Sequence, residues 1–205
     1  MSAPVTVVDY GAGNLRSLRA ALERLGAEVV VTSDPGTVER SRSLMVPGVG
    51  AAGPAMARLR SAGLADAIAR AAGGGAHVVG ICLGLQLLFD RSEEGDTECL
   101  GLLPGVVRRI DWARTVPHMG WNDVAPVNGE PLAGALPAVC YFAHTYVAEP
   151  AEAADVVATT ELEGRRFASA VGRGRVAAVQ FHPERSGPAG RALLAALLRR
   201  TADAA

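Results

Sequence analysis

Short apolar runs rich in β-branched residues alternate with helical patterns along most of this 205-residue chain, and this alternation most constrains its fold. The runs lie at residues 5–8, 29–32, 44–46, 78–81, 156–158 and 176–181. In the first helical segment, four leucines repeat at helical spacing: Leu15, Leu18, Leu22 and Leu25. Asn14 is placed to cap that helix and Gly26 to end it. The pattern predicts a three-layer α/β fold, with a largely parallel central sheet flanked by helices.

Further helices are expected at 54–71, directly after Cys82, and at 188–200. Between residues 101 and 147 the pattern changes to proline-punctuated segments with weak periodicity, which indicates extra strands and loops laid over the core. We find no internal repeat and no linker composition in the sequence. A single domain spanning 1–205 is therefore expected.

Charge and composition exclude several classes of function. With 20 basic and 21 acidic residues, the formal charge of −1 gives no reason to expect a nucleic acid or an anionic membrane as partner. Every basic residue is Arg, which excludes Schiff-base lysine chemistry and a P-loop. No leader pattern or apolar run of about 18 residues is present. The Gly11-Ala12-Gly13 turn fails as a dinucleotide fingerprint, because Arg16 stands at the third glycine position.

The three cysteines, Cys82, Cys99 and Cys140, are an odd number without metal-ligand spacing. Neither a disulfide framework nor a metal site is indicated, and no cofactor is expected. A reducing, cytoplasmic setting fits this cysteine usage best.

One cysteine has the setting of a nucleophile. The apolar run at 78–81 leads into Cys82 and then directly into a helical pattern, with Gly80 and Gly84 on either side. Such a strand-to-helix turn is a nucleophile elbow. The helix N-terminus favours the thiolate, and the Leu83 N–H points at a developing oxyanion. The alternative is that Cys82 is a small core residue, which is common for buried cysteines.

Two other strand ends carry polar or glycine-rich segments. His182 and Glu184 end the last apolar run two residues apart, and in an extended chain this spacing puts both side chains on one face. Glu184 can then orient His182, which in turn can deprotonate Cys82 and protonate a leaving group. The Pro47-Gly48-Val49-Gly50 segment follows another strand, and either Val49 or Gly50 is a candidate second oxyanion donor. Ligands bind at the carboxyl ends of parallel strands, so the three segments are expected to converge.

Together these three segments closely resemble the class I, triad-type glutamine amidotransferases, whose fold is flavodoxin-like. The resemblance implies that Cys82, His182 and Glu184 are the catalytic triad and that Val49, Gly50 and Leu83 form the oxyanion hole. It also implies that glutamine is the substrate. Its binding residues would be Gly48, Gly50, Gln86, Glu94, Thr145 and Tyr146.

Four segments, at 9–14, 117–122, 141–146 and 181–186, are similar to the family of glutaminase subunits of imidazole glycerol phosphate synthases. That resemblance implies a heterodimer in which ammonia passes to a (β/α)8-barrel cyclase for histidine biosynthesis. The interface candidates are Asn14, His118, Trp121, Tyr141 and Arg185. His144 is either a core residue or part of the site.

Three alternatives remain open from the sequence. The chain could supply ammonia to another acceptor, although the 117–122 segment argues against this. It could be a non-catalytic binding module on the same fold, which would be favoured if a triad member were missing. A cysteine peptidase or other hydrolase on a similar scaffold is the third alternative.

Overall fold

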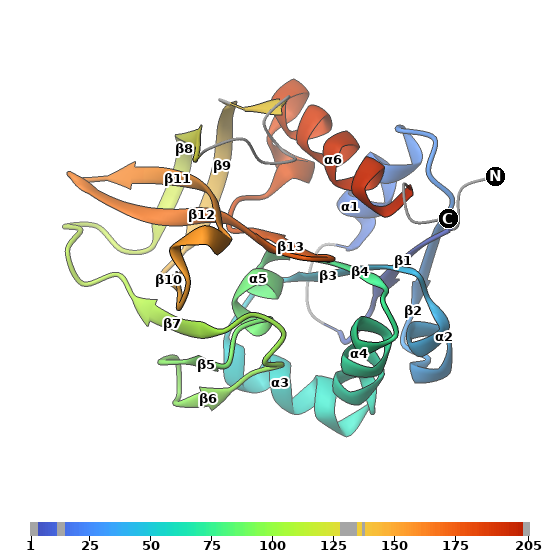
Figure 1. Cartoon of the computed structure of the whole chain (residues 1–205). Coiled ribbons are helices and arrows are strands. Elements are labelled where there is room, and N and C mark those ends of the chain that lie inside the picture. The colour runs from blue at the N-terminus through green and yellow to red at the C-terminus, as the bar shows by residue number, and fades with distance from the viewer. Residues whose placement is uncertain (1–3, 12–14, 128–134, 137, 203–205) are drawn as a thin grey trace.

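The computed structural model describes residues 4–11, 15–127, 135–136 and 138–202. At its centre is a five-stranded parallel sheet in the order β2-β1-β3-β4-β13 (Figure 1). The strands are β1 (Val5–Val8), β2 (Val29–Thr32), β3 (Ser43–Gly48), β4 (His77–Cys82) and β13 (Val176–Val179). This is the flavodoxin-like strand order, with the last strand contributed from far along the chain. The apolar runs of the sequence are thus confirmed as strands, which are buried in β1, β3, β4 and β13 and half-buried in β2 at the edge of the sheet.

Beyond β13 the sheet continues through strands that are mostly antiparallel, in the order β12-β10-β7-β5-β6. Their bounds are β12 (Arg165–Arg173), β10 (Tyr146–Pro150), β7 (Gly105–Arg109), β5 (Arg91–Ser92) and β6 (Thr97–Glu98). Three more strands branch from β12: β11 (Val156–Leu162), β8 (His118–Pro126) and β9 (Ala138–His144). The extra strands expected between 101 and 147 are therefore present, and the largely parallel arrangement describes the half of the sheet that holds β1 to β4 and β13.

Helices cover both faces of the parallel half (Figure 1). On one face lie α1 (Leu15–Glu23) and α6 (Gly187–Ala202), which bury Leu18, Leu22 and Leu193 among others. On the other face lie α2 (Pro35–Arg40), α3 (Ala52–Ser61), α4 (Leu64–Gly73) and α5 (Leu83–Leu87). Two 3-10 turns, η2 (Ala153–Asp155) and η3 (Pro183–Arg185), complete the described elements.

The helix expected at 54–71 is in fact two helices, α3 and α4. Gly63 lies between them with a φ of 69°, a left-handed conformation that cannot continue an α-helix. The six-residue helix α2 was not expected from the sequence. Asp34 caps it by accepting a 2.8 Å hydrogen bond from the Thr37 N–H. In the described part of the chain, no helix is long and apolar enough to cross a membrane.

Candidate active site

The elbow at Cys82 is formed as the sequence predicts. Cys82 is the last residue of β4 and directly precedes α5, and its backbone has φ 55° and ψ −111°, which is strained for a residue with a side chain. The backbone of α5 packs against that of β3 so closely that a Cβ on Gly84 would lie 1.7 Å from the Val46 carbonyl oxygen. A Cβ on Gly80 would lie 2.8 Å from the Gly84 carbonyl oxygen. The two glycines therefore permit the turn that presents Cys82.

The Cys82 thiol lies at the floor of the site, with only 4% of the residue exposed. Its sulfur lies 3.9 Å from the Ala143 carbonyl oxygen and 3.8 Å from Nε2 of Gln180. Leu83 is the first residue of α5, so its N–H has no partner within that helix. A negative charge that develops beside the Cys82 sulfur would therefore meet the N-terminal end of the helix.

His182 and Glu184 form a buried hydrogen-bonded pair. Nδ1 of His182 lies 2.9 Å from Oε1 of Glu184, and the two side chains are 6% and 9% exposed. The His182 N–H donates to the Tyr141 carbonyl, and the Ser186 hydroxyl donates to the His182 carbonyl. With Nδ1 committed to the carboxylate, Nε2 is the nitrogen that can exchange a proton with Cys82.

The local geometry of the pair differs from the expected extended chain. His182 is extended, with φ −102° and ψ 91°, but Pro183 starts the 3-10 turn η3 and Glu184 lies within it. This turn brings the Glu184 carboxylate back to Nδ1 of His182. The prediction that the two side chains share one face of an extended strand is therefore wrong, although the predicted contact between them is present. Proline suits this position because its φ is already that of a helical turn.

The electrostatics of the site favour a protonated His182. Burial works to lower the pKa of His182, but its hydrogen bonds to Cys82 and Glu184 and their negative charges outweigh burial and raise it to about 10. The site thus places a protonated imidazole next to the sulfur of Cys82.

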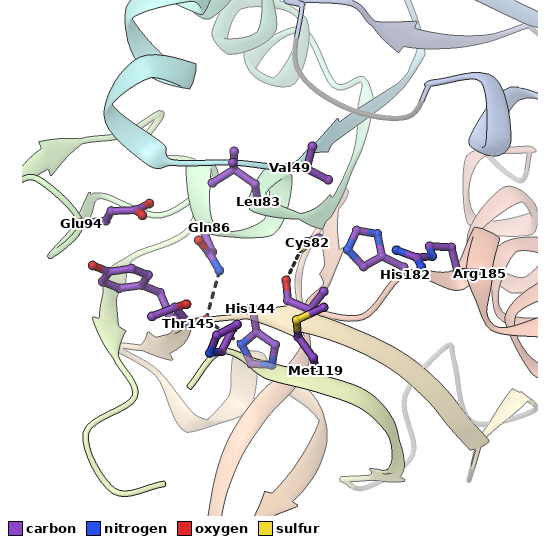
Figure 2. A pocket seen from close by; sticks show the side chains of 14 residues that line it. Val49, Cys82, Leu83, Gln86, Glu94, Met119, His144, Thr145, His182 and Arg185 are labelled. Carbon is purple, nitrogen blue, oxygen red and sulfur yellow. Dashed lines mark hydrogen bonds between the residues drawn. The ribbon is translucent and has the colours of Figure 1, made fainter. Parts of the chain in front are cut away.

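A cavity of about 230 Å³ opens above Cys82, between the end of β3, the elbow and the β9–β10 turn (Figure 2). It brings together seven predicted residues beside Cys82 and His182: Val49, Gly50, Leu83, Gln86, Glu94, Thr145 and Tyr146. His144 also lines it and is only 5% exposed, so both interpretations left open for that residue hold. Gly48 is not among the lining residues; it is buried behind the wall, where a Cβ would lie 2.2 Å from the Tyr10 hydroxyl.

Gln86 and Glu94 lie on the same side of the cavity, away from His182 (Figure 2). Oε2 of Glu94 accepts a 2.7 Å hydrogen bond from the Ala52 N–H at the start of α3. Nε2 of Gln86 donates to the Tyr146 carbonyl and to Oε1 of Gln180, both at 3.1 Å. The side of the cavity opposite His182 is therefore lined by a carboxylate and an amide, each held by hydrogen bonds within the protein.

Two residues of the site were missed by the sequence reasoning. Tyr10 donates a 2.8 Å hydrogen bond to the Pro47 carbonyl. Burial is the main cause that raises the pKa of its phenol, and the electrostatic effect of the nearby Cys82 is the second. Gln180 is fully buried and joins Gln86 to Cys82. A signal for Gln180 was available, because a polar residue two positions before His182 in an apolar strand must share its face. For Tyr10 the sequence carries no such signal.

The interface candidates divide into two groups. Trp121 is 58% exposed and meets Tyr141 edge-on, and the Arg185 guanidinium stacks over the Tyr141 ring at 4.2 Å. Met119 and Val139, which we did not predict, are exposed on the same face of the β8–β9 hairpin. We call this set, Met119, Trp121, Val139, Tyr141 and Arg185, the docking face.

The other two candidates do not belong to that face. His118 is only 7% exposed, because alternation along β8 turns it to the inner face of the hairpin, so its assignment to the interface is wrong. Asn14 lies outside the described residues.

The family model of class I glutamine amidotransferases matches residues 6–200 of this chain. The chain therefore belongs to the class I glutamine amidotransferases. Solved structures agree in fold: a glutamine amidotransferase crystal structure superposes with a TM-score of 0.78 at 24% identity, covering 96% of this chain and 98% of the other. A glutamine amidotransferase from Thermotoga maritima gives 0.72 at 16% identity, with full coverage of both chains.

Sequence relatives narrow the class to one family. The chain is 47% identical to the imidazole glycerol phosphate synthase subunit HisH of Moorella thermoacetica, over 89% of this chain and 88% of the relative. It is 43% identical to the subunit of the same name from Gloeobacter violaceus, over 97% and 90% of the two chains. Within the class, this chain belongs to the HisH family.

Proposed function

We propose that this chain is the glutaminase subunit of an imidazole glycerol phosphate synthase, with Cys82, His182 and Glu184 as its catalytic triad. The observation that carries the proposal is the buried His182–Glu184 pair beside a cysteine on a strained elbow at a helix N-terminus. The family match over residues 6–200 supports one glutamine amidotransferase domain. The three unpaired cysteines fit the reducing cytoplasm.

In the first half of the reaction, the Cys82 thiolate attacks the side-chain carboxamide carbon of glutamine. The carbonyl oxygen becomes an oxyanion, to which the Leu83 N–H and an N–H of Val49 or Gly50 would donate. His182 then gives its Nε2 proton to the amide nitrogen, the C–N bond breaks, and ammonia leaves. The product on the enzyme is a γ-glutamyl thioester of Cys82.

In the second half, neutral His182 takes a proton from water, and the resulting hydroxide attacks the thioester carbon. The C–S bond breaks, Cys82 returns as the thiolate beside protonated His182, and the new carboxylic acid group loses its proton to solvent as glutamate is released. Glu184 holds the imidazole in one orientation throughout and offsets its positive charge. No external oxidant, metal or nucleotide is needed to balance these steps.

The cavity supports an amino-acid substrate with its carboxamide at Cys82 and its head group at the opposite side. Glu94 offers a carboxylate there, which suits an α-ammonium group. Thr145 and Tyr146 line the same cavity. One small cavity of about 230 Å³ thus holds both Cys82 and the residue proposed to bind the head group, Glu94.

The docking face supports a protein partner, proposed here to be the (β/α)8-barrel cyclase. Trp121 and Arg185 are exposed and Tyr141 is half-buried, and Trp, Tyr and Arg are the types most enriched in binding hot spots. Met119 and Arg185 belong both to this face and to the lining of the cavity, so a partner seated there would border the cavity from which ammonia leaves. That continuity is what favours delivery of ammonia to a partner over release to solvent.

The test is reconstitution with the cyclase subunit. We expect co-purification and glutamine-dependent turnover of the cyclase substrate, and we expect Trp121→Ala to weaken the complex by at least about tenfold, as a central aromatic contact would. Arg70→Ala, on the exposed side of α4 near the other end of the sheet, is the matched control and should bind normally. Strong glutaminase activity without any binding to the cyclase would favour another ammonia acceptor.

A further inference from the structure

A chain of polar groups runs beneath the β8–β9 hairpin, on the face opposite the docking face. Nδ2 of Asn122 lies 3.3 Å from Nε2 of His118, and Nδ1 of His118 lies 2.9 Å from Nε2 of His144. Nδ1 of His144 in turn lies 2.9 Å from the Tyr146 carbonyl oxygen. These hydrogen bonds therefore connect strand β8 to Tyr146, which lines the cavity.

The carbonyl at one end fixes the direction of every hydrogen bond in this chain. Because the Tyr146 carbonyl can only accept, Nδ1 of His144 must carry its proton, which leaves Nε2 of neutral His144 as an acceptor. Nδ1 of His118 must then donate to it, and Nε2 of His118 accepts from the Asn122 amide. The Asn122 amide also donates to the Glu161 carbonyl at 2.9 Å. A single tautomer of each histidine, with the proton on Nδ1, therefore allows every one of these hydrogen bonds to form.

This arrangement needs both imidazoles to be neutral, and their surroundings keep them so. Burial lowers the pKa of His118. Burial also lowers the pKa of His144 to about 3, in spite of the opposing effect of its hydrogen bond to the Tyr146 carbonyl, and the positive charge of His182 acts in the same direction as burial. The His118 ring stacks on Phe142 with 4.9 Å between ring centroids, so its orientation is held by packing as well.

Beyond Tyr146 the chain continues toward the nucleophile. The same Tyr146 carbonyl accepts from Nε2 of Gln86, whose other contact is Oε1 of Gln180. Both hydrogens of the Gln86 amide are thereby committed, so the oxygen is the atom that this side chain can offer to a ligand in the cavity. Nε2 of Gln180 then faces the Cys82 sulfur at 3.8 Å.

We propose that His118 is a positioning residue for substrate binding: through His144 it holds the Tyr146 carbonyl, and so turns the Gln86 oxygen toward the ammonium group of the substrate. The inference rests on the proposed glutaminase function. His118 neither lines the cavity nor contacts Cys82, so its effect is exerted through His144. His118, which the 117–122 segment suggested as an interface residue, thus supports the wall of the cavity instead.

The first test is the glutamine kinetics of the cyclase-bound enzyme. His118→Phe keeps an aromatic ring against Phe142 but removes the hydrogen bonds that His118 makes to Asn122 and His144. We expect KM for glutamine to rise about 5- to 30-fold, as loss of a buried hydrogen bond would give, with kcat changed less than about threefold. His118→Asn places an amide N–H near the position of Nδ1 and should restore most of the wild-type KM. His77→Asn, at the start of β4 and so at the opposite end of that strand from Cys82, is the matched control.

Two further readouts separate this role from a purely structural one. Alkylation of Cys82 by iodoacetamide does not use the head-group site, so its rate should stay within about twofold of wild type in His118→Phe. In the free chain at pH 7, nitrogen NMR should show protonated Nδ1 and bare Nε2 on both His118 and His144.

An unchanged KM in folded His118→Phe, or a proton on Nε2 of His144, would overturn the proposal. The NMR result does not depend on glutamine turnover, so it stands or falls separately from the glutaminase function. Absence of turnover in the wild-type complex would instead count against that function.

Discussion

Gly84→Ala is the substitution whose effect the structure defines most sharply. The added Cβ would lie 1.7 Å from the Val46 carbonyl oxygen, whereas ordinary contacts of a Cβ begin near 3.4 Å. The backbones of α5 and β3 must therefore part by about 1.7 Å. Neither is a flexible side chain that can move aside, since both belong to the buried layer that carries Cys82.

We expect Gly84→Ala to lower the free energy of unfolding by about 3 kcal/mol, at the upper end of the range for overpacking. For a chain of this size that corresponds to a fall in Tm of about 6–12 °C. Because a misplacement of about 1 Å can cost a hundredfold in rate, the glutaminase kcat of the cyclase complex should fall by about 100-fold or more even below the Tm.

The measurements are urea unfolding of the free chain and glutamine hydrolysis by the complex. Gly73→Ala is the matched control, because a Cβ on this last residue of α4 meets nothing within 4 Å and its φ is ordinary. It should leave activity unchanged and stability unchanged or raised by up to about 0.5 kcal/mol. A Gly84→Ala protein with the Tm and kcat of that control would refute the argument that the elbow depends on this close approach.

Three further predictions concern the proposed triad and the residues that support it. Glu184→Gln removes the charge paired with His182, so the pKa of His182 measured by NMR should fall toward its usual 6.5 and kcat should fall about 10²- to 10⁴-fold. Because folding raises the pKa of His182, its proton contributes stability that is complete below about pH 6.5 and is lost as pH rises through about 10. Urea unfolding across this range should therefore show the free energy of unfolding falling as pH rises. The fall should be smaller in Glu184→Gln. Tyr10→Phe leaves the Pro47 carbonyl without its hydroxyl partner and should cost about 1–3 kcal/mol in urea unfolding. That variant should also lower kcat/KM, because Pro47 lies just before Val49 and Gly50, the proposed oxyanion residues. A kcat/KM equal to that of the wild type would exclude a role of Tyr10 in holding that segment.

The parallel half of the fold was predictable because its strands read as continuous apolar runs, which is typical of strands covered on both faces, although β2 at the edge is only half-buried. Residues 5–8 and 29–32 match β1 and β2 as predicted. The break at Gly63 was not found, because the apolar periodicity on either side hides a single left-handed residue. The order of the antiparallel strands could not be derived either, since it depends on pairings such as β12 with both β10 and β11.

The site was predictable where chemistry and local chain geometry coincide. A cysteine between glycines at a strand-to-helix junction carries its own structural reason, so Cys82 and Leu83 could be assigned from the sequence. Residues that act through long-range contacts could not: Tyr10 meets Pro47 across 37 positions, and Gln180 meets Gln86 across 94. His118 was misassigned because the phase of β8 relative to the core decides which of its faces is buried.

The most direct test of the account is covalent labelling of the chain in complex with its cyclase by a glutamine-shaped electrophile, followed by peptide mass mapping. We predict one adduct per chain, on Cys82, and protection by glutamine. Cys99 and Cys140 are internal controls, because burial raises the pKa of each thiol to about 11 and should leave them unmodified. Failure to label Cys82, or labelling of Cys99 or Cys140 in its place, would contradict the assignment of the nucleophile.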